Sequence, residues 1–348
     1  MANTRRILGK SASGHFKIVE EPIPPLKKGE VLVEVHASAI SPGTELGRVK
    51  ISGEKPAENE VFRGFGYQNA GIVLETSEDY PHIKPGQRVA CMGAGYAVHG
   101  TYACVPINLL CPLPDNVSFE EGAFIALAAT SLNAVRRAEL QLGEFVLVMG
   151  LGIVGQFVAQ QACLAGTHVL AVDRFALRGE AAKKSGVENI CLDPGTLVET
   201  AAKFTRGYGM DCTFICFGGD ATEAFNTAVK TMKVTPDTHV CGRVVVPGGA
   251  TITQRFGAGL GNMDIRSAAR TGPGYHDEAY EYGADYPKVF VQWTTKRNLE
   301  ELLGWMSAGK IQVKPMITHV VPLDEAPDAC RLIIEHPEQT LGVVLKMK

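Results

Sequence analysis

The stretch from residue 145 to residue 174 constrains the fold of this chain more than any other part of the sequence. It contains an apolar strand, the turn Gly150-Leu-Gly-Ile-Val-Gly155, an apolar helix of about four turns to Gly166, and a second apolar strand that ends in Asp173. This succession of elements is typical of a βαβ unit whose turn binds a dinucleotide. We therefore expect a dinucleotide site at this turn.

The three glycines of the turn have separate roles in that interpretation. Gly150 permits the tight turn, Gly152 lets the backbone approach a pyrophosphate, and Gly155 lets the helix lie close to the strand. The pyrophosphate would lie at the N-terminus of the helix that begins near Ile153, where free N–H groups and the helix dipole favour negative charge. The alternative is an ordinary βαβ unit in which the glycines serve packing alone.

The acid that ends the second strand bears on the choice of cofactor. Asp173 follows Gly155 by 18 residues and would accept a hydrogen bond from the 2′-hydroxyl of NAD while repelling the 2′-phosphate of NADP. Arg174 and Arg178 keep NADP open, because either can meet a phosphate or stack on adenine. The predicted cofactor-binding residues are Gly150, Gly152, Ile153, Val154, Gly155, Asp173, Arg174, Arg178, Thr130 and Phe217.

Length and composition limit the remaining possibilities. A chain of 348 residues exceeds the size at which one core stops growing, so two domains are expected. A net charge of −3 gives no basic surface for nucleic acid, and no apolar run approaches the ~18 residues of a membrane span. The polar N-terminus argues against export, and the nine scattered cysteines are those of a reduced, cytoplasmic protein.

The remainder of the chain follows two patterns. Short strands are expected at 16–20, 30–35, 70–75, 87–91 and 102–106, and a helical pattern runs from 119 to 138. Strands and helices then alternate to residue 247, which predicts a doubly wound parallel sheet. After a long loop at 257–286, the pattern predicts a strand at 288–293, a helix at 299–308, and a strand, a helix and a strand at 317–321, 327–335 and 342–346.

The long loop combines glycine, tyrosine and charge, a mixture that suits a polyhydroxylated ligand. We expect substrate contacts from Arg270, Tyr275, His276 and Tyr282 of this loop, and from Arg63 outside it. Arg266, Tyr280 and Asp285 lie in the same loop without an assigned role. The alternative is a solvated lid or a dimer contact.

The order of domains and several short sequence segments resemble the medium-chain dehydrogenase/reductase superfamily over nearly the whole chain. The matching segments are Pro42-Gly-Thr-Glu45, Gly66-Tyr-Gln-Asn-Ala-Gly71, Lys84-Pro-Gly-Gln-Arg-Val89, Val105-Pro-Ile-Asn-Leu109, Gly242-Arg-Val-Val-Val and Ile317-Thr-His-Val. The resemblance implies an α/β fold: a β-rich GroES-like catalytic domain (1–125 and 295–348) and a Rossmann dinucleotide-binding domain (126–294). It also implies a homodimer, paired through the edge strand at 288–293.

The zinc enzymes of that superfamily have metal ligands that this chain lacks. Pro42 stands at the position of the ligand cysteine, Tyr67 at that of the histidine, and Ala126 near the third ligand. Proline and alanine cannot bind Zn²⁺, and phenol is a poor substitute for imidazole. The structural zinc lobe would need four closely spaced cysteines, whereas only Cys91 and Cys104 occur there. The resemblance is therefore to a zinc-lacking branch, and no metal is expected.

Without zinc, a side chain must move the proton while the nicotinamide moves the hydride. Tyr67 is the first candidate; to act as a base it would need a nearby cation, such as Arg63, and it alternatively only fills the vacated metal cavity. Thr44 matches the hydroxyl that relays protons in the zinc enzymes, or else caps the turn. Glu45 is an acid beside it, or pairs with Lys346 or an arginine. His99 is a base or a buried core histidine.

The resulting prediction is an NAD(P)-dependent oxidoreductase that interconverts a secondary alcohol and a ketone on a sugar-, cyclitol- or polyol-like substrate without a metal. The sugar-like substrate rests on the zinc-lacking branch, which resembles this chain in Ser-Pro-Gly-Thr-Glu near residue 41 and in the segment from Gly272 to Asn298. The alternatives are a zinc-independent reductase of enones or quinones, and a nucleotide-binding protein without turnover.

Overall fold

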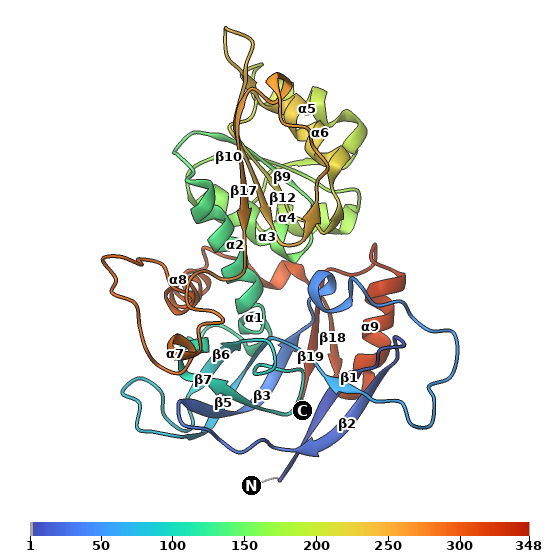
Figure 1. Ribbon diagram of the computed structural model, residues 1–348, viewed down its shortest axis with the longest axis vertical. Coiled ribbons are helices and arrows are strands. Elements are labelled where there is room, and N and C mark those ends of the chain that lie inside the picture. The colour runs from blue at the N-terminus through green and yellow to red at the C-terminus, as the bar shows by residue number, and fades with distance from the viewer. Residues whose placement is uncertain (1–2, 348) are drawn as a thin grey trace. The chain divides into compact units, whose positions relative to one another are not determined.

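The computed structural model describes residues 3–347, which divide into two compact units. The first unit contains residues up to Ala129 together with 272–309 and 317–347, and the second contains 130–271 and 310–316 (Figure 1). The sequence prediction had placed residues 272–294 in the nucleotide-binding domain. They pack in the first unit instead, because their backbone and side chains bind to residues of that unit.

The first unit is built on two sheets. Three strands are ordered β2-β1-β4, and seven form a sheet ordered β18-β19-β3-β5-β6-β8, with β7 paired to β3. All these pairs are antiparallel except β18 with β19. The strands are β1 (Thr4–Lys10), β2 (Phe16–Pro22), β3 (Glu30–Ala39), β4 (Arg63–Gly64), β5 (Gln68–Thr76), β6 (Arg88–Met92), β7 (Tyr102–Pro106), β8 (Leu110–Pro112), β18 (Ile317–Pro322) and β19 (Gly342–Lys346). The strands expected in this domain are confirmed.

Short helical segments connect these strands. A five-residue π-helical turn, η1 (Pro42–Leu46), follows β3 directly and has proline at its start, where a missing N–H costs nothing. The other helical elements of this unit are η2 (Ile107–Leu109), α1 (Phe119–Gly122), α7 (Glu278–Glu281), α8 (Thr295–Ser307), η6 (Leu323–Glu325) and α9 (Ala326–Glu335). Helix α2 (Ile125–Ala138) begins in this unit and ends in the second.

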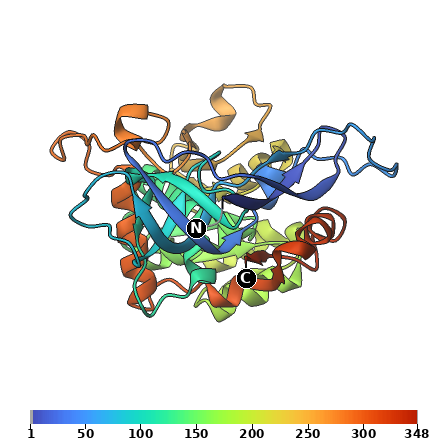
Figure 2. The same ribbon diagram turned by 90° about the horizontal axis from the view of Figure 1, so that it is seen from below.

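The chain between η1 and β4, residues 47–62, has no regular structure. In Figures 1 and 2 this blue segment extends away from the strands of the first unit. Glu54 and Glu60 tie this segment to His15 of the first unit.

The second unit contains the doubly wound parallel sheet that the sequence predicts. Its strands are ordered β11-β10-β9-β12-β15, β17 extends the parallel sheet beyond β15, and β14 pairs antiparallel with β15. The strands are β9 (Phe145–Met149), β10 (His168–Val172), β11 (Asn189–Cys191), β12 (Cys212–Ile215), β14 (Lys233–Val234), β15 (Val240–Pro247) and β17 (Asn262–Ala268). Two short strands, β13 (Gly219–Asp220) and β16 (Ala250–Thr251), pair separately.

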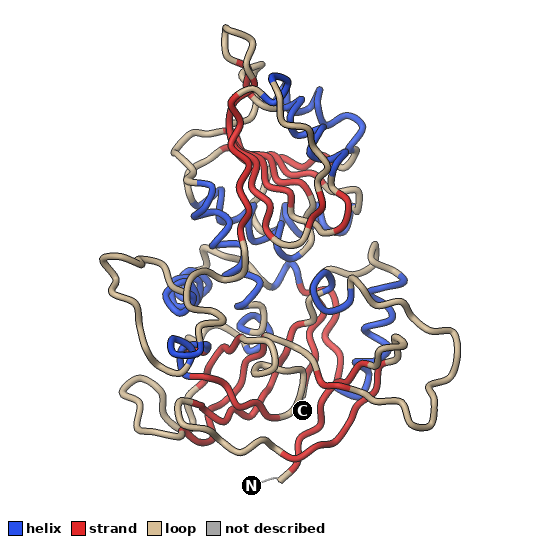
Figure 3. Tube along the Cα trace, viewed as in Figure 1, coloured by secondary structure: helices blue, strands red, loops and turns tan. Residues whose placement is uncertain are grey.

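Helices cover both faces of this sheet (Figure 3). Val146 and Val148 of β9 pack in one core with residues of α2, α3 (Ile153–Leu164) and α4 (Ala176–Lys184). Leu147 and Met149 of the same strand pack in a second core with α5 (Leu197–Phe204) and α6 (Thr222–Thr231). Alternate residues of a strand point to opposite faces, so the continuous apolar run of β9 fills both cores. Three short segments complete the unit: η3 (Pro194–Thr196), η4 (Ala258–Leu260) and η5 (Lys314–Met316).

One expected strand is wrong. Residues 288–293 form a turn and loop before α8, drawn as loop in Figure 3, and Val289 and Phe290 are more than four-fifths exposed. The place beside β15 is taken by β17, within the segment 257–286 that was expected to be loop. β17 pairs with β15 over seven residues, from Asn262 to Ala268. This long register satisfies a run of backbone groups and leaves no place there for 288–293.

The nine cysteines are free, as the sequence predicts, and most are buried. Burial raises the pKa of the Cys104 thiol to about 11 and that of Cys111 to about 12, so both are uncharged packing groups at neutral pH. No helix in residues 3–347 is long and apolar enough to cross a membrane.

Candidate functional site

The glycine turn of the second unit has the geometry that a bound pyrophosphate requires. Gly150 has φ +89°, a left-handed conformation that favours glycine. A Cβ at Gly155 would stand 1.8 Å from the Gly150 carbonyl oxygen, so only glycine lets α3 approach this closely. Around Gly152, by contrast, an added Cβ would meet no atom within 4 Å. The turn is therefore closed on the side of the sheet and open at Gly152, the N-cap of α3.

Asp173, directly after β10, is hydrogen-bonded to this turn. Its Oδ2 accepts the Leu151 N–H at 2.7 Å and its Oδ1 accepts the Phe175 N–H at 2.9 Å. The residue is 7% exposed, and Oδ2 lies 3.6 Å from Nη1 of Arg178. Each carboxylate oxygen can accept a second hydrogen bond, so Asp173 can both hold the turn and accept a ribose hydroxyl.

The other predicted cofactor residues lie in the second unit, as the turn does. Arg174 and Arg178 place their guanidinium groups 4.8 and 4.6 Å from the centre of the Phe175 ring. Burial lowers the pKa of Arg178, and the Asp173 charge opposes that effect. Phe217, which follows β12, lies beside Gly150: its Cδ1 would be 3.0 Å from a Cβ there. Ile153 and Val154 form the first turn of α3, and Thr130 lies within α2.

In the first unit, Tyr67 lies just before β5 in a group of polar side chains. Burial raises the pKa of the Tyr67 phenol, and the negative charge of Glu45 raises it further. Hydrogen bonds to the side chains of Ser41 and Thr44 lower the pKa, and Tyr275 makes a smaller contribution that raises it. The phenol is therefore a proton donor at neutral pH, held by two hydroxyl groups.

Glu45 and His99 form a buried pair next to this phenol. His99 is 0% exposed and Glu45 is 5% exposed, and His99 Nε2 lies 3.1 Å from Glu45 Oε2. The same Oε2 accepts the Ser41 N–H at 2.7 Å. The expected partner Lys346 is instead paired with Glu120 at 3.4 Å. His99 is therefore a buried histidine, in agreement with the second alternative, and both of its ring nitrogens have side-chain partners.

Arg63 does not provide a cation for Tyr67. It is exposed on the short strand β4, in register with Lys10 of β1. The largest charge effect on Tyr67 comes from an acid, Glu45, which is opposite to the effect of a cation. Arg63 therefore does not lower the pKa of Tyr67 toward that of a base.

The predicted substrate residues of the long loop are divided between the two units. Arg270 belongs to the second unit, whereas Tyr275, His276 and Tyr282 belong to the first. Of these residues, Tyr275 raises the pKa of Tyr67. The Tyr275 hydroxyl accepts the Ala94 N–H at 2.8 Å. Tyr282 donates to buried Glu30 at 2.9 Å, and His276 has φ +72° in the turn that leads to α7.

Three further loop residues have structural roles. Tyr280 is 1% exposed and stacks on Tyr286, and Asp285 is paired with Arg297. Arg266 lies in β17 of the second unit, paired with Asp264 and Glu139.

The residues at the expected zinc positions do not fit a zinc ion. The side chains of Pro42 and Ala126 contain no donor atom, and the Tyr67 phenol is bound by Ser41 and Thr44. Within residues 3–347 there is no group of three or more His, Cys, Asp or Glu side chains that could hold a metal ion.

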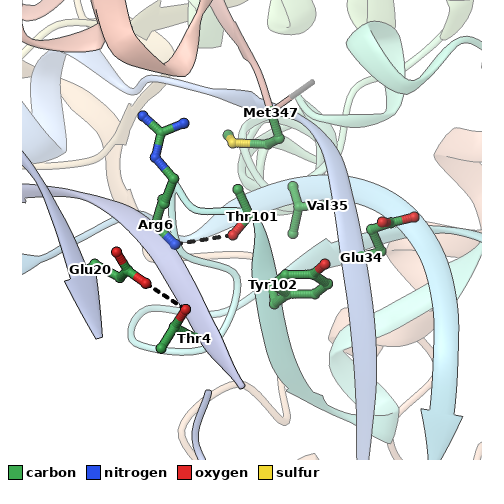
Figure 4. Close-up of a pocket in the computed structure, with 8 residues that line it drawn as sticks. All are labelled: Thr4, Arg6, Glu20, Glu34, Val35, Thr101, Tyr102 and Met347. Carbon is green, nitrogen blue, oxygen red and sulfur yellow. Dashed lines mark hydrogen bonds between the residues drawn. The ribbon is translucent and has the colours of Figure 1, made fainter. Parts of the chain in front are cut away.

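A separate hollow of about 260 Å³ opens elsewhere on the first unit (Figure 4). Thr4 donates to Glu20 and the Arg6 N–H donates to Thr101 along its wall. None of the predicted site residues lines it.

Sequence reasoning missed Ser38 and Ser41. Ser41 was read only as part of a family segment, and Ser38 is an ordinary strand residue. Ser38 Oγ lies 2.5 Å from Nδ1 of His99 and donates to the Gln68 carbonyl at 2.8 Å. The period-two pattern of β3 places Ser38 and His36 on one face, but no local signal pairs Ser38 with a residue 61 positions later.

Two family models match the chain: one described as an alcohol dehydrogenase GroES-like domain at residues 27–115, and one described as a zinc-binding dehydrogenase at residues 154–283. Sorbitol dehydrogenase of Arabidopsis thaliana is 31% identical over 288 residues, covering 73% of this chain and 71% of its own. Sorbitol dehydrogenase of Mus musculus is 26% identical over 351 residues, covering 91% and 89%. A solved alcohol dehydrogenase of Escherichia coli, in complex with NADH, is 19% identical and superposes with a TM-score of 0.75 over 99% of this chain and 100% of its own.

Proposed function

The chain belongs to the medium-chain dehydrogenase/reductase superfamily and is an oxidoreductase of the alcohol dehydrogenase type, and on this basis we propose that it interconverts a secondary alcohol and a ketone with a nicotinamide cofactor and no catalytic metal. The proposed substrate is a polyol, sugar or cyclitol. The observation that carries the proposal is the glycine turn, shaped on one side by Gly155 and open at Gly152.

NAD is the proposed cofactor. Backbone N–H groups at the start of α3 would hold the pyrophosphate, and Asp173 would accept a ribose hydroxyl with the capacity left after it binds Leu151 and Phe175. Arg174 and Arg178 keep NADP as the second possibility. A protein with the same fold binds NADH, which supports a nicotinamide cofactor. When bound, the nicotinamide supplies or accepts the hydride.

The proton is assigned to Tyr67. Its raised pKa keeps the phenol protonated, so in ketone reduction it donates that proton to the substrate oxygen. Thr44 and Ser41 orient the hydroxyl, and Thr44 is itself exposed on η1. In a zinc enzyme the metal would stabilise this oxygen. Here no step is assigned to a metal, because Pro42 and Ala126 offer no ligand.

The substrate class rests on hydroxyl chemistry. Ser41, Thr44, Tyr67 and Tyr275 form a group of side chains that both donate and accept hydrogen bonds, as polyol hydroxyls do. The two curated relatives described above are sorbitol dehydrogenases, and this agrees with a polyol. An apolar enone would offer these hydroxyl groups fewer hydrogen bonds than a polyol does.

The experiment is a spectrophotometric screen of polyols, sugar phosphates, cyclitols and enones with NAD and NADP, together with metal analysis of the purified protein. We expect turnover of a polyol-type alcohol with NAD and no stoichiometric zinc. Tyr67→Phe is expected to lower kcat by roughly 10²–10⁴-fold, whereas Tyr80→Phe, a matched change outside the site, is expected to leave it unchanged. Stoichiometric zinc, turnover of enones alone, or an unchanged kcat in Tyr67→Phe would overturn the proposal.

A further inference from the structure

The pair Glu45 and His99 is the strongest unassigned feature next to Tyr67. Both residues are at least 95% buried, yet both carry groups that titrate. The mechanism above uses neither of them. Their protonation can be derived from their hydrogen bonds.

The proton count starts at Ser38. Its hydroxyl has one proton, which it donates to the Gln68 carbonyl oxygen at 2.8 Å. The contact of 2.5 Å between Ser38 Oγ and His99 Nδ1 therefore needs a proton on the ring nitrogen. Nδ1 of His99 is thus protonated and donates to Ser38.

The other ring nitrogen faces an acid. His99 Nε2 lies 3.1 Å from Glu45 Oε2, which already accepts the Ser41 N–H. Two lone pairs at this distance repel each other, so a proton lies between Nε2 and Oε2. The pair therefore holds one proton more than a neutral imidazole beside a carboxylate, and its net charge is zero.

The charge of Glu45 affects the pKa of Tyr67, and the second carboxylate oxygen of Glu45 is not neutralised by a hydrogen bond from the described residues. Glu45 Oε1 is buried and has no hydrogen-bond partner among the described residues, and Glu45 exerts the largest charge effect on the Tyr67 phenol. Two further titratable groups lie near this place. Tyr275 raises the pKa of Tyr67, and Glu45 raises the pKa of Cys330 of α9.

Lys10 is the remaining charge near the pair. Its Nζ donates to the backbone carbonyl of Glu45 at 2.7 Å, and so it binds the main chain of η1 and leaves the carboxylate to His99.

Resting on the proposed function, we propose that Glu45 and His99 are a positioning pair for Tyr67: they share one buried proton that keeps the pair neutral, so that Tyr67 can give its own proton to the substrate oxygen. In this step the Tyr67 O–H bond breaks and the substrate O–H bond forms. The phenolate that remains lies beside a neutral pair and regains its proton from water after product release. If the pair loses its proton, the Glu45 carboxylate opposes the phenolate and proton donation slows.

The two halves of the pair should then act in opposite directions. His99→Gln retains a donor to Glu45 but removes the shared proton and leaves the Glu45 carboxylate charged, so kcat for ketone reduction should fall tenfold or more. Glu45→Gln removes the negative charge that opposes the Tyr67 phenolate, so kcat should rise, and its decline at high pH should disappear. A merely structural pair would lower kcat in both variants, in step with their loss of thermal stability.

Glu30→Gln is the matched control. Glu30 is also a buried acid, at 3% exposure, and it also accepts a backbone N–H, that of Lys27 at 3.0 Å. It belongs to no part of the proposed site. This variant should lose stability as Glu45→Gln does while keeping the wild-type pH profile.

A second readout does not depend on turnover. Nitrogen-15 NMR of the His99 ring, assigned by its absence in His99→Gln, should show a proton on Nδ1 and a second proton shared between Nε2 and Glu45 in the wild type, and only the proton on Nδ1 in Glu45→Gln. A wild-type His99 whose Nε2 shares no proton with Glu45, or equal losses of kcat in both variants with unchanged pH profiles, would overturn the inference. If the NMR result holds and no alcohol is oxidised in the screen, the proposed function fails while the proton-sharing pair stands.

Discussion

A methyl group at Gly155 would stand 1.8 Å from the carbonyl oxygen of Gly150, far inside the contact distance of carbon and oxygen. Gly152, three residues earlier, has open space and a φ of −63° that any residue adopts. Gly155→Ala is therefore expected to destabilise the second unit by roughly 1–3 kcal/mol. Gly152→Ala is expected to change stability by less than about 0.5 kcal/mol and to weaken NADH binding at least tenfold, because its methyl group occupies the space of the pyrophosphate.

Thermal unfolding and NADH fluorescence titration of both variants separate these effects. Each variant is the control of the other, since both add one methyl group to the same turn. Unaltered NADH affinity in Gly152→Ala would show that no pyrophosphate lies at this turn.

Asp173→Asn is expected to affect both stability and nucleotide binding. The amide can accept at only one position, so the Leu151 or Phe175 N–H loses a partner, at a cost of about 1–3 kcal/mol. The dissociation constant of NAD should rise about tenfold or more, and that of NADP less, because the charge that repels the 2′-phosphate is gone. Calorimetric titration of both nucleotides measures the difference.

Asp193→Asn is the control for this change. Asp193 also accepts a backbone N–H, that of Gly195 at 2.9 Å, but it does so at the exposed cap of η3. This variant should bind NAD normally. If Asp173→Asn does so too, the ribose assignment is wrong.

The glycine turn was predictable from sequence because its constraints are local. A left-handed φ at Gly150 and a close approach at Gly155 each exclude all side chains, and the apolar runs on both sides fix the strand and the helix. The spacing to Asp173 then follows from the length of α3 and β10. The nucleotide half of the candidate site is therefore visible in about thirty residues.

The errors concern pairing between distant segments. Residues 288–293 and 262–268 both contain apolar positions, and only the seven-residue register with β15 decides between them. The partner of Glu45 was also unpredictable, because Glu45 lies in η1 and His99 lies 54 positions later, in the bend that precedes β7. Residue types indicated an acid and a base near Tyr67, but nothing local indicated that they bind each other.

The segment 47–62 should respond to pH through His15 and Glu60. His15 Nδ1 lies 2.9 Å from Glu60 Oε1, and Nε2 lies 2.8 Å from the Glu54 carbonyl oxygen. Hydrogen bonds from Ser11, Ser13 and His15 hold the pKa of Glu60 down, to about 2, while the bond to Glu60 raises the pKa of His15 and Arg331 opposes this.

The sign of the effect follows from these directions. Glu60 stabilises the segment fully above its ordinary pKa of 4.5, and this is lost as the pH falls toward about 2. His15 stabilises it fully below 6.5, and this is lost as the pH rises through its raised pKa. Protection of residues 47–62 from hydrogen exchange, corrected for intrinsic rates, should thus be greatest between pH 4.5 and 6.5.

His15→Gln should remove the loss of protection on the alkaline side, since glutamine does not titrate. The control is His336→Gln, which alters an exposed His–Glu pair, 3.4 Å from Glu338, and should leave the profile unchanged. A wild-type segment whose protection is constant from pH 5 to pH 8 would contradict the prediction.

The outer edge of β17 should join two copies of the chain. Among the described residues β17 pairs with no strand other than β15, so its other edge can accept a further strand. An antiparallel pairing of two β17 strands centred on Ile265, which is 38% exposed, would place Asp264 of each copy opposite Arg266 of the other.

Sedimentation should therefore give a mass of about twice 37.3 kDa at micromolar concentration. Asp264→Arg would oppose like charges and should shift the protein to monomer, whereas Glu199→Arg, on exposed α5, should remain dimeric. A wild-type monomer under these conditions would exclude this pairing. If the seven residues of β17 paired between two copies, the protein would be a dimer at this concentration.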